Sequence, residues 1–218
     1  MAEHQVDAIL ITDPVNIRYA TDARNMSLFH MRNPVRYFLC ILNGPRILFE
    51  SAFGDAEHTE DLPTIDATVD PIGFTYTSSG DRNLEHFQKW YKQMEGYLAK
   101  HNCKHIAIEG KISNLVKDRF EADGHFVVKD AVEIMEKAKC IKNEEEVKCI
   151  KYAIDVVADA YTYMHKKCKP GMTENKLWSH FHQHVIEHDS EYIETRLMTS
   201  GEKTNPWFQE CGTRKISK

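Results

Sequence analysis

The chain has 218 residues, 42% of them hydrophobic and 28% charged, values typical of a soluble globular protein of one or two domains. The formal net charge is −5, and Lys and Arg are scattered among acids without a basic stripe, which argues against a nucleic-acid partner. No apolar run approaches the roughly 20 residues that cross a bilayer, and the N-terminus lacks a secretory pattern, so we expect no membrane partner and a cytoplasmic location.

Short apolar runs in the first half of the chain predict β-strands. The first run ends at Asp13-Pro14, which predicts a turn. The second and third runs flank Asn43-Gly44-Pro45 and therefore predict a β-hairpin. The predicted strands cover residues 7–12, 37–43, 46–50, 105–109 and 126–129.

Two predicted helices lie between these strands, over residues 81–101 and 113–122, with Gly124 as the stop of the second. The first has apolar positions at helical spacing that we expect to face the sheet: Leu84, Phe87, Tyr91, Met94 and Leu98. Strands that alternate with helices predict a layered α/β domain over residues 1–130. The hairpin makes its sheet mixed rather than parallel.

The second half of the chain, residues 131–218, has mostly helical periodicity. Asn143 and Glu146 predict a capping box at the start of a long helix. Its apolar face is predicted at Val147, Ile150, Ile154, Val157, Tyr161, Met164 and Cys168. Thr173 is the predicted cap of the next helix, which runs to about His188, and residues 192–199 predict a strand.

Three histidines, His180, His184 and His188, share one predicted helical face and would in principle hold a metal. The segment is not H-E-x-x-H, and nothing nearby supplies an obvious third ligand of the type that a catalytic site needs, so we favour a solvated or half-buried helix face. Asp155 and Asp159 are likewise interpreted as a solvated flank rather than a pair of catalytic carboxylates.

The six cysteines form no C-x-x-C pair and have no zinc-ribbon spacing. We interpret them as small buried side chains in a reducing compartment. Pairing among Cys140, Cys149 and Cys168 stays open from the sequence alone.

Three segments, taken in order, resemble the creatinase, prolidase and aminopeptidase P family of pita-bread metallohydrolases. They are VDAILITDPVNIRYATD at 6–22, KCIKNEEEVKCIKYAIDVVADAY at 139–161, and KPGMTENKLW followed by TSGEKTNPW. The resemblance implies a creatinase-type N-terminal domain with ribonuclease H-like layering at 1–130. It also implies the first, incomplete part of an α+β pita-bread catalytic domain at 131–218.

Two stretches, RNMSLFHMRNPVRYFLC at 24–40 and TNPWFQECGTRKIS at 204–217, are more similar to bacterial dimethylsulfoniopropionate lyases. Peptidases of the family usually carry Pro-His where this chain has Pro206-Trp207, and that His lies at their substrate site. The resemblance therefore favours a lyase-like member and makes Asn205 and Trp207 the candidate substrate-binding residues. A core aromatic is the alternative interpretation of Trp207.

In this family two metal ions, held by two Asp, one His and two Glu, activate a water or polarise the substrate. Those ligands follow the segment matched here by residues 214–216, so the resemblance transfers no metal or catalytic residue to this chain. It implies a fragment, truncated at both ends and inactive alone, of a dimeric parent enzyme that holds a divalent metal pair and acts on a small molecule or dipeptide.

Two other functions remain as alternatives. One is a metal-free binding or dimerisation module that acts through the α/β domain. The other, an intact metalloenzyme that uses the face from His180 to His188, predicts bound zinc. A partial pita-bread domain would expose apolar surface, so we expect the chain alone to aggregate or to bind a partner through residues 140–218.

Overall fold

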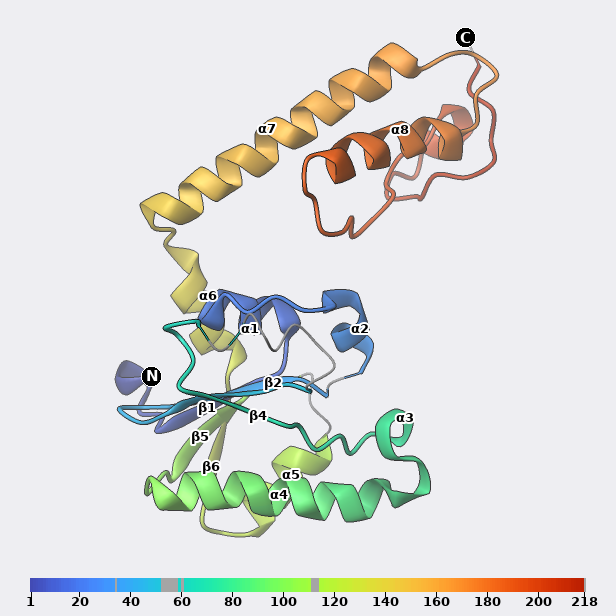
Figure 1. Cartoon of the computed structure of the whole chain (residues 1–218). Helices are drawn as coiled ribbons and strands as arrows, with labels where there is room; N and C mark the ends of the chain where they lie inside the picture. The colour runs from blue at the N-terminus through green and yellow to red at the C-terminus, as the bar shows by residue number, and fades with distance from the viewer. Residues whose placement is uncertain (34, 52–58, 60, 111–113, 218) are drawn as a thin grey trace. The chain divides into compact units, whose positions relative to one another are not determined.

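The computed structural model describes residues 1–33, 35–51, 59, 61–110 and 114–217. The chain divides into two compact units, Met1–Ile141 and Lys142–Lys218 (Figure 1). The boundary predicted near Asp130 lies before a helix that packs on the first unit. The assignment of 1–130 and 131–218 to two family domains stays a prediction.

The first unit is built on a six-stranded mixed sheet. Its strands are β1 (Ala8–Ile11), β2 (Tyr37–Ile41), β3 (Arg46–Phe49), β4 (Ala67–Val69), β5 (His105–Ile108) and β6 (Val127–Asp130). They lie in the order β4-β3-β2-β1-β5-β6. The pairs β1–β2 and β2–β3 are antiparallel and the other three are parallel, so the predicted hairpin and the mixed sheet are confirmed. The short β4 was not predicted.

Helices cover both faces of this sheet, which gives three layers (Figure 1). Ala8 and Leu10 point into one core together with α4 (Asn83–Lys100) and α5 (Asn114–Ala122). Ile9 and Ile11 point into the opposite core together with α1 (Pro14–Thr21) and α6 (Val132–Cys140). Alternate residues of a strand face opposite sides, so β1 is apolar throughout. Shorter helical segments are η1 (Ala2–His4), α2 (Ser27–Arg32), α3 (Tyr76–Ser79) and η3 (Gly80–Arg82).

The predicted sheet-facing side of α4 is correct except at its start. Phe87, Tyr91, Met94 and Leu98 are all buried, but Leu84 is 63% exposed. The predicted helical spacing of the apolar residues is confirmed, but α4 contacts the core only from Phe87 onward. The helix predicted from Ser113 is α5; Ser113 itself lies outside the described residues.

The turn predicted at Asp13-Pro14 is instead the start of α1. The Asp13 carboxylate accepts hydrogen bonds from the backbone N–H groups of Val15 and Asn16, at 2.9 and 3.3 Å. Pro14 occupies the first helical position, where its missing N–H costs nothing. The same residue pair is favourable in a turn and at a helix start, so the sequence signal was ambiguous.

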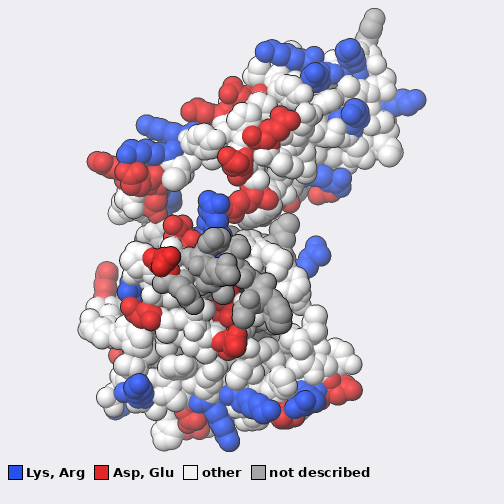
Figure 2. Space-filling model, viewed as in Figure 1, with Lys and Arg blue, Asp and Glu red and all other residues white. Residues whose placement is uncertain are grey.

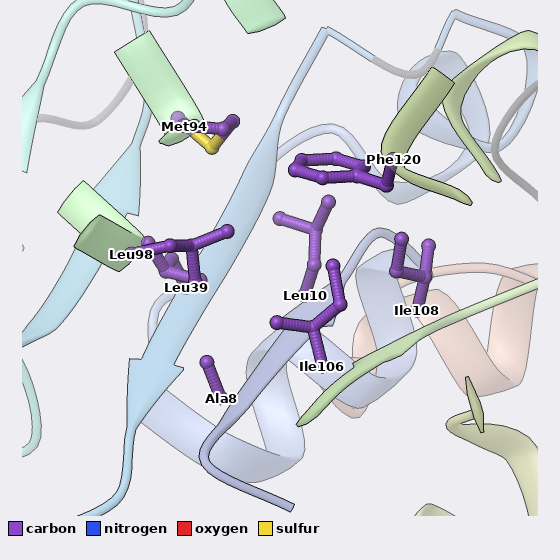
Figure 3. Close-up of a pocket in the computed structure, with 8 residues that line it drawn as sticks. All are labelled: Ala8, Leu10, Leu39, Met94, Leu98, Ile106, Ile108 and Phe120. Atoms are coloured by element: carbon purple, nitrogen blue, oxygen red, sulfur yellow. The ribbon is translucent and has the colours of Figure 1, made fainter. Parts of the chain in front are cut away.

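A small cavity of about 10 Å³ lies between the sheet and the helices α4 and α5 (Figure 3). It is lined by apolar side chains alone: Ala8, Leu10, Leu39, Met94, Leu98, Ile106, Ile108 and Phe120. The space is about that of one water molecule and offers no hydrogen-bond partner, so we expect it to be dry. It is a packing defect of the core and no ligand site.

Removal of one methyl group beside this cavity, by Ile106→Val, is expected to lower the free energy of unfolding by about 1 kcal/mol. Urea unfolding of the two proteins measures the difference. Val127→Ala, at a strand position that is 52% exposed, is the control and should cost less. Equal losses would mean that Ile106 is not in a tightly packed core.

The second unit contains α7 (Glu144–Lys167), α8 (Glu174–Glu187) and the short η4 (Gly201–Thr204). The predicted capping box is present, because Asn143 and Glu146 each accept a hydrogen bond from the other's backbone N–H. The strand predicted at 192–199 is wrong. In the described part of the chain this segment forms only an isolated bridge, between Leu197 and Glu210.

The predicted apolar face of α7 is present, but α8 does not cover most of it. α7 meets α8 through Val156, Ala160 and Met164, and one side of the Tyr161 ring contacts Phe181 with centroids 5.1 Å apart. Among the described residues of α7, only Ala160 is buried. The exposed apolar positions, called the α7 stripe below, are Val147 (38% exposed), Ile150 (43%), Ile154 (60%), Val157 (40%) and Tyr161 (50%).

Charges of both signs are interspersed on the face drawn in Figure 2. This arrangement agrees with the scattered Lys and Arg of the sequence. None of the described helices is long and apolar enough to span a membrane.

Candidate substrate-binding loop

The segment Ser200–Gly212 contains both candidate residues and is anchored at the start of α8. The first N–H groups of a helix have no partner within the helix. Here the carbonyl of Arg214 accepts from Glu174 N at 3.0 Å, and the carbonyl of Gly212 accepts from Asn175 N at 2.9 Å. The Thr173 hydroxyl accepts from Lys176 N at 3.1 Å, which confirms the predicted cap. The end of the loop is therefore fixed to a rigid helix.

The Glu174 carboxylate holds both ends of this loop. Its side chain is fully buried. One oxygen accepts from the backbone N–H and the hydroxyl of Ser200, both at 2.8 Å. The other accepts from Gly212 N at 3.0 Å and from the Lys203 ammonium at 3.2 Å. Four donors around one buried carboxylate make it the main polar anchor of the loop.

The hydrogen bonds also decide the charge state of this carboxylate. Burial by itself raises the pKa of Glu174. The hydrogen bonds from Ser200, Lys203 and Gly212 act in the opposite direction and outweigh burial, so the pKa of Glu174 is lowered from its ordinary value of 4.5. Glu174 is therefore an anion that its donors stabilise.

Gly201 is required for the close approach of Arg214 to the loop. Its φ of +57° lies in the left-handed region. A Cβ at this position would also collide with the Arg214 guanidinium. Both features explain the glycine that follows Ser200 at the beginning of the loop.

The tip of the loop exposes two aromatic side chains. Asn205 is exposed and precedes Pro206 through a cis peptide bond. Trp207 is 76% exposed and Phe208 is 67% exposed, so the interpretation of Trp207 as a core aromatic is wrong. The two ring centroids are 5.0 Å apart and the ring planes meet at 84°. The sequence alone did not single out Phe208.

His180 and His184 of α8 and His188, which follows the helix, do not form a metal site. The rings of His184 and His188 stack with centroids 4.3 Å apart, and the Tyr163 ring stacks on His184 at 5.4 Å. A ring nitrogen of His188 donates to the His184 carbonyl at 2.7 Å. Nowhere among the described residues do three His, Cys, Asp or Glu side chains come together as ligands. These residues do not fit the metal pair that the family resemblance implies, and no chemical step is assigned to a metal on them.

Other buried charges hold the first unit together. Arg36 pairs with Glu50 at 3.0 Å, and both side chains are almost fully buried. Glu109, at the end of β5, accepts from the backbone N–H groups of Thr12 and Asp13, both at 2.7 Å. These contacts connect loops to the sheet, and we assign them no chemistry.

None of the six cysteines forms a disulfide bond, so none of the possible pairings is present. Cys103 and Cys211 are buried as expected, and burial raises the pKa of both thiols. Cys140, Cys149 and Cys168 are exposed, which corrects their interpretation as buried side chains.

A comparison with models of protein families finds no match. Two curated relatives match almost the whole chain. Dimethylsulfoniopropionate lyase DddP of Roseovarius nubinhibens is 30% identical over 226 residues, which cover 99% of this chain and 49% of the relative. The lyase DddP of Roseobacter denitrificans is 30% identical over 213 residues, which cover 94% of this chain and 47% of the relative.

The fold matches solved prolidase structures. Prolidase from Pyrococcus furiosus has a TM-score of 0.74 and 16% identity, and the match covers 100% of this chain and 60% of that chain. The Xaa-Pro dipeptidase from Bacillus anthracis has a TM-score of 0.73 and 13% identity, with 99% and 54% covered. The chain is a relative of the creatinase, prolidase and aminopeptidase P proteins. It spans about half the length of the curated relatives that it matches.

This similarity gives the two units their context. The mixed α/β sheet and the helical second unit correspond to part of the pita-bread prolidase fold. The loop with Asn205 and Trp207 lies in the second unit.

Proposed function

We propose that this chain is part of a metal-dependent lyase that acts on dimethylsulfoniopropionate. The observation that carries the proposal is the 30% identity to two DddP lyases over 99% and 94% of the chain. The solved peptidases, at 13–16% identity, support the fold and not the substrate.

The proposed reaction is a β-elimination. A base removes a proton from the carbon next to the substrate carboxylate, the C–S bond breaks, and its electron pair leaves with the sulfur. The products are dimethyl sulfide, acrylate and the proton on the base. We assign neither the base nor the metal ligands to residues of this chain.

We assign substrate contact to Asn205 and Trp207. The Asn205 amide is an exposed donor that suits the substrate carboxylate. Trp207 occupies the position at which the family resemblance places the peptidase histidine. An indole cannot act as an acid or base there, so the substitution favours a lyase over an Xaa-Pro peptidase.

The domains, the metal pair, the location and the oligomeric state of the whole enzyme are also part of this proposal. Residues 1–130 form the creatinase-type domain, and 131–218 begin the catalytic domain. We place the divalent metal pair, which would polarise the substrate when bound, in a part of the enzyme outside residues 1–218. The enzyme is a cytoplasmic homodimer.

A chimera tests the proposed function. Residues 1–218 replace the matching segment of the Roseovarius nubinhibens DddP, and the metal-loaded protein is assayed with dimethylsulfoniopropionate and with an Xaa-Pro dipeptide. We expect release of dimethyl sulfide and no dipeptide hydrolysis. Hydrolysis of the dipeptide alone would place the chain with the peptidases. A folded chimera that is inactive in both assays would favour a metal-free binding or dimerisation module.

A further inference from the structure

Phe208, which has no role assigned so far, lies beside Trp207 at the tip of the Ser200–Gly212 loop. Most of the surface of Trp207 and Phe208 is in water, although burial of such rings is strongly favourable. The two rings make an edge-to-face contact, at 84° with centroids 5.0 Å apart, so the ring faces that stay exposed lie nearly at a right angle to each other and are called the aromatic corner below.

The backbone of Phe208, one of the two residues of this corner, is in a strained conformation. Phe208 has a φ of +76°, which is rare for a bulky residue, and such strain is concentrated at binding and catalytic sites. The Glu174 carboxylate binds the loop at Ser200 and at Gly212, on either side of Phe208 in the sequence. The aromatic corner is thus presented on a fixed support.

Aromatic faces attract cations whose charge lies on methyl groups. A sulfonium or quaternary ammonium ion donates no strong hydrogen bond and is weakly hydrated, so a ring face suits it better than a polar pocket. The charge of the loop is favourable for such a cation. Ser200–Gly212 contains two glutamates and one lysine, a formal charge of −1. Lys203 is paired with Glu174, and Glu210 is paired with Arg196, so both of these cations are neutralised by a carboxylate.

We propose that Trp207 and Phe208 form a binding corner for a methylated onium cation, such as the sulfonium end of the substrate. The inference rests on the proposed function for the choice of sulfonium. It goes beyond that function by adding Phe208 and by assigning the two rings to the cation rather than to the carboxylate. A dipeptide offers an ammonium with three N–H donors, which this corner does not satisfy.

Proton NMR titration of the 218-residue chain tests the corner without any metal or turnover. Trimethylsulfonium is added, with tert-butyl alcohol as an uncharged ligand of similar size. We expect ring currents to move the trimethylsulfonium methyl signal upfield in a saturable manner, with a much smaller effect on the alcohol. Equal shifts of the two ligands, or no saturable shift, would overturn the proposal.

Matched variants locate the binding. Trp207→Leu and Phe208→Leu keep apolar bulk and remove one ring face each, and we expect affinity to fall roughly threefold or more in each, as the loss of a cation–π contact implies. Tyr76→Leu removes an aromatic ring of the first unit that is 68% exposed, and it should change nothing. An equal loss in all three variants would overturn the assignment. A chimera that releases dimethyl sulfide while the chain fails to bind onium ions would refute the corner alone.

Discussion

Glu174→Gln is expected to destabilise the second unit by about 3 kcal/mol. The carboxylate accepts four hydrogen bonds, from Ser200 N, Ser200 Oγ, Gly212 N and Lys203 Nζ. A glutamine keeps one acceptor oxygen, but its NH₂ group replaces the other oxygen and faces N–H or O–H donors, with which it cannot form a hydrogen bond. It also leaves Lys203 without its counter-charge.

Hydrogen exchange of the α8 amides measures this loss, because it reports the local opening free energy. Glu187→Gln is the matched control, since Glu187 is exposed on the same helix and its change should stay within about 0.5 kcal/mol. Similar exchange rates in the two variants would show that Glu174 does not anchor the loop.

The lowered pKa of Glu174 gives the same prediction a pH dependence. Between the lowered pKa of the folded state and the ordinary value of 4.5, the unfolded chain binds the extra proton. The contribution of Glu174 to stability is therefore fully present above 4.5 and is lost as the pH falls through the folded-state pKa. As the pH falls through this acidic range, the α8 amides of the unsubstituted chain should lose protection from hydrogen exchange. The loss should be smaller in Glu174→Gln, because a glutamine does not titrate.

The second large effect is expected at the α7 stripe. Five apolar side chains, 38–60% exposed, follow one line on a 24-residue helix. Contiguous exposed apolar surface of this kind promotes association. We expect the chain to self-associate with rising concentration, and Ile150→Lys combined with Ile154→Lys to weaken this association at least about tenfold through lost apolar burial.

Sedimentation velocity over a range of concentrations measures that association. Leu84→Lys is the control, because Leu84 is 63% exposed but lies in α4 of the first unit. A wild-type chain that stays monomeric at every concentration, with cooperative unfolding, would contradict the role of the stripe. Equal weakening by Leu84→Lys would mean that charge alone, and not the stripe, controls association.

Local sequence signals predicted the regular elements well. The hairpin followed from its turn residues, and the cap of α7 followed from Asn143 and Glu146, because these signals act within a few residues. The strand predicted at residues 192–199 is absent, because a strand forms only where a partner strand is available, and this segment has only the isolated bridge to Glu210. The turn predicted at Asp13-Pro14 was wrong because the same residue pair is favourable in a turn and at a helix start.

The candidate site was only partly predictable from the sequence. Asn205 and Trp207 came from family resemblance, and their exposure agrees with a surface role. The role of Glu174 was missed, because a glutamate after a helix cap normally interacts with the helix dipole at the surface. Only the return of the chain at Ser200 and Gly212 surrounds it with donors. Phe208 became a candidate through its distance from Trp207 and its positive φ.

Dimethyl sulfide release by the DddP chimera tests the central claim most directly, when it is compared with the same chimera carrying Trp207→His. We predict that the chimera with Trp207 releases dimethyl sulfide, and that Trp207→His lowers kcat/KM for dimethylsulfoniopropionate at least about tenfold, as the loss of one good substrate contact implies. A folded chimera that hydrolyses Xaa-Pro dipeptides and releases no dimethyl sulfide would contradict the account.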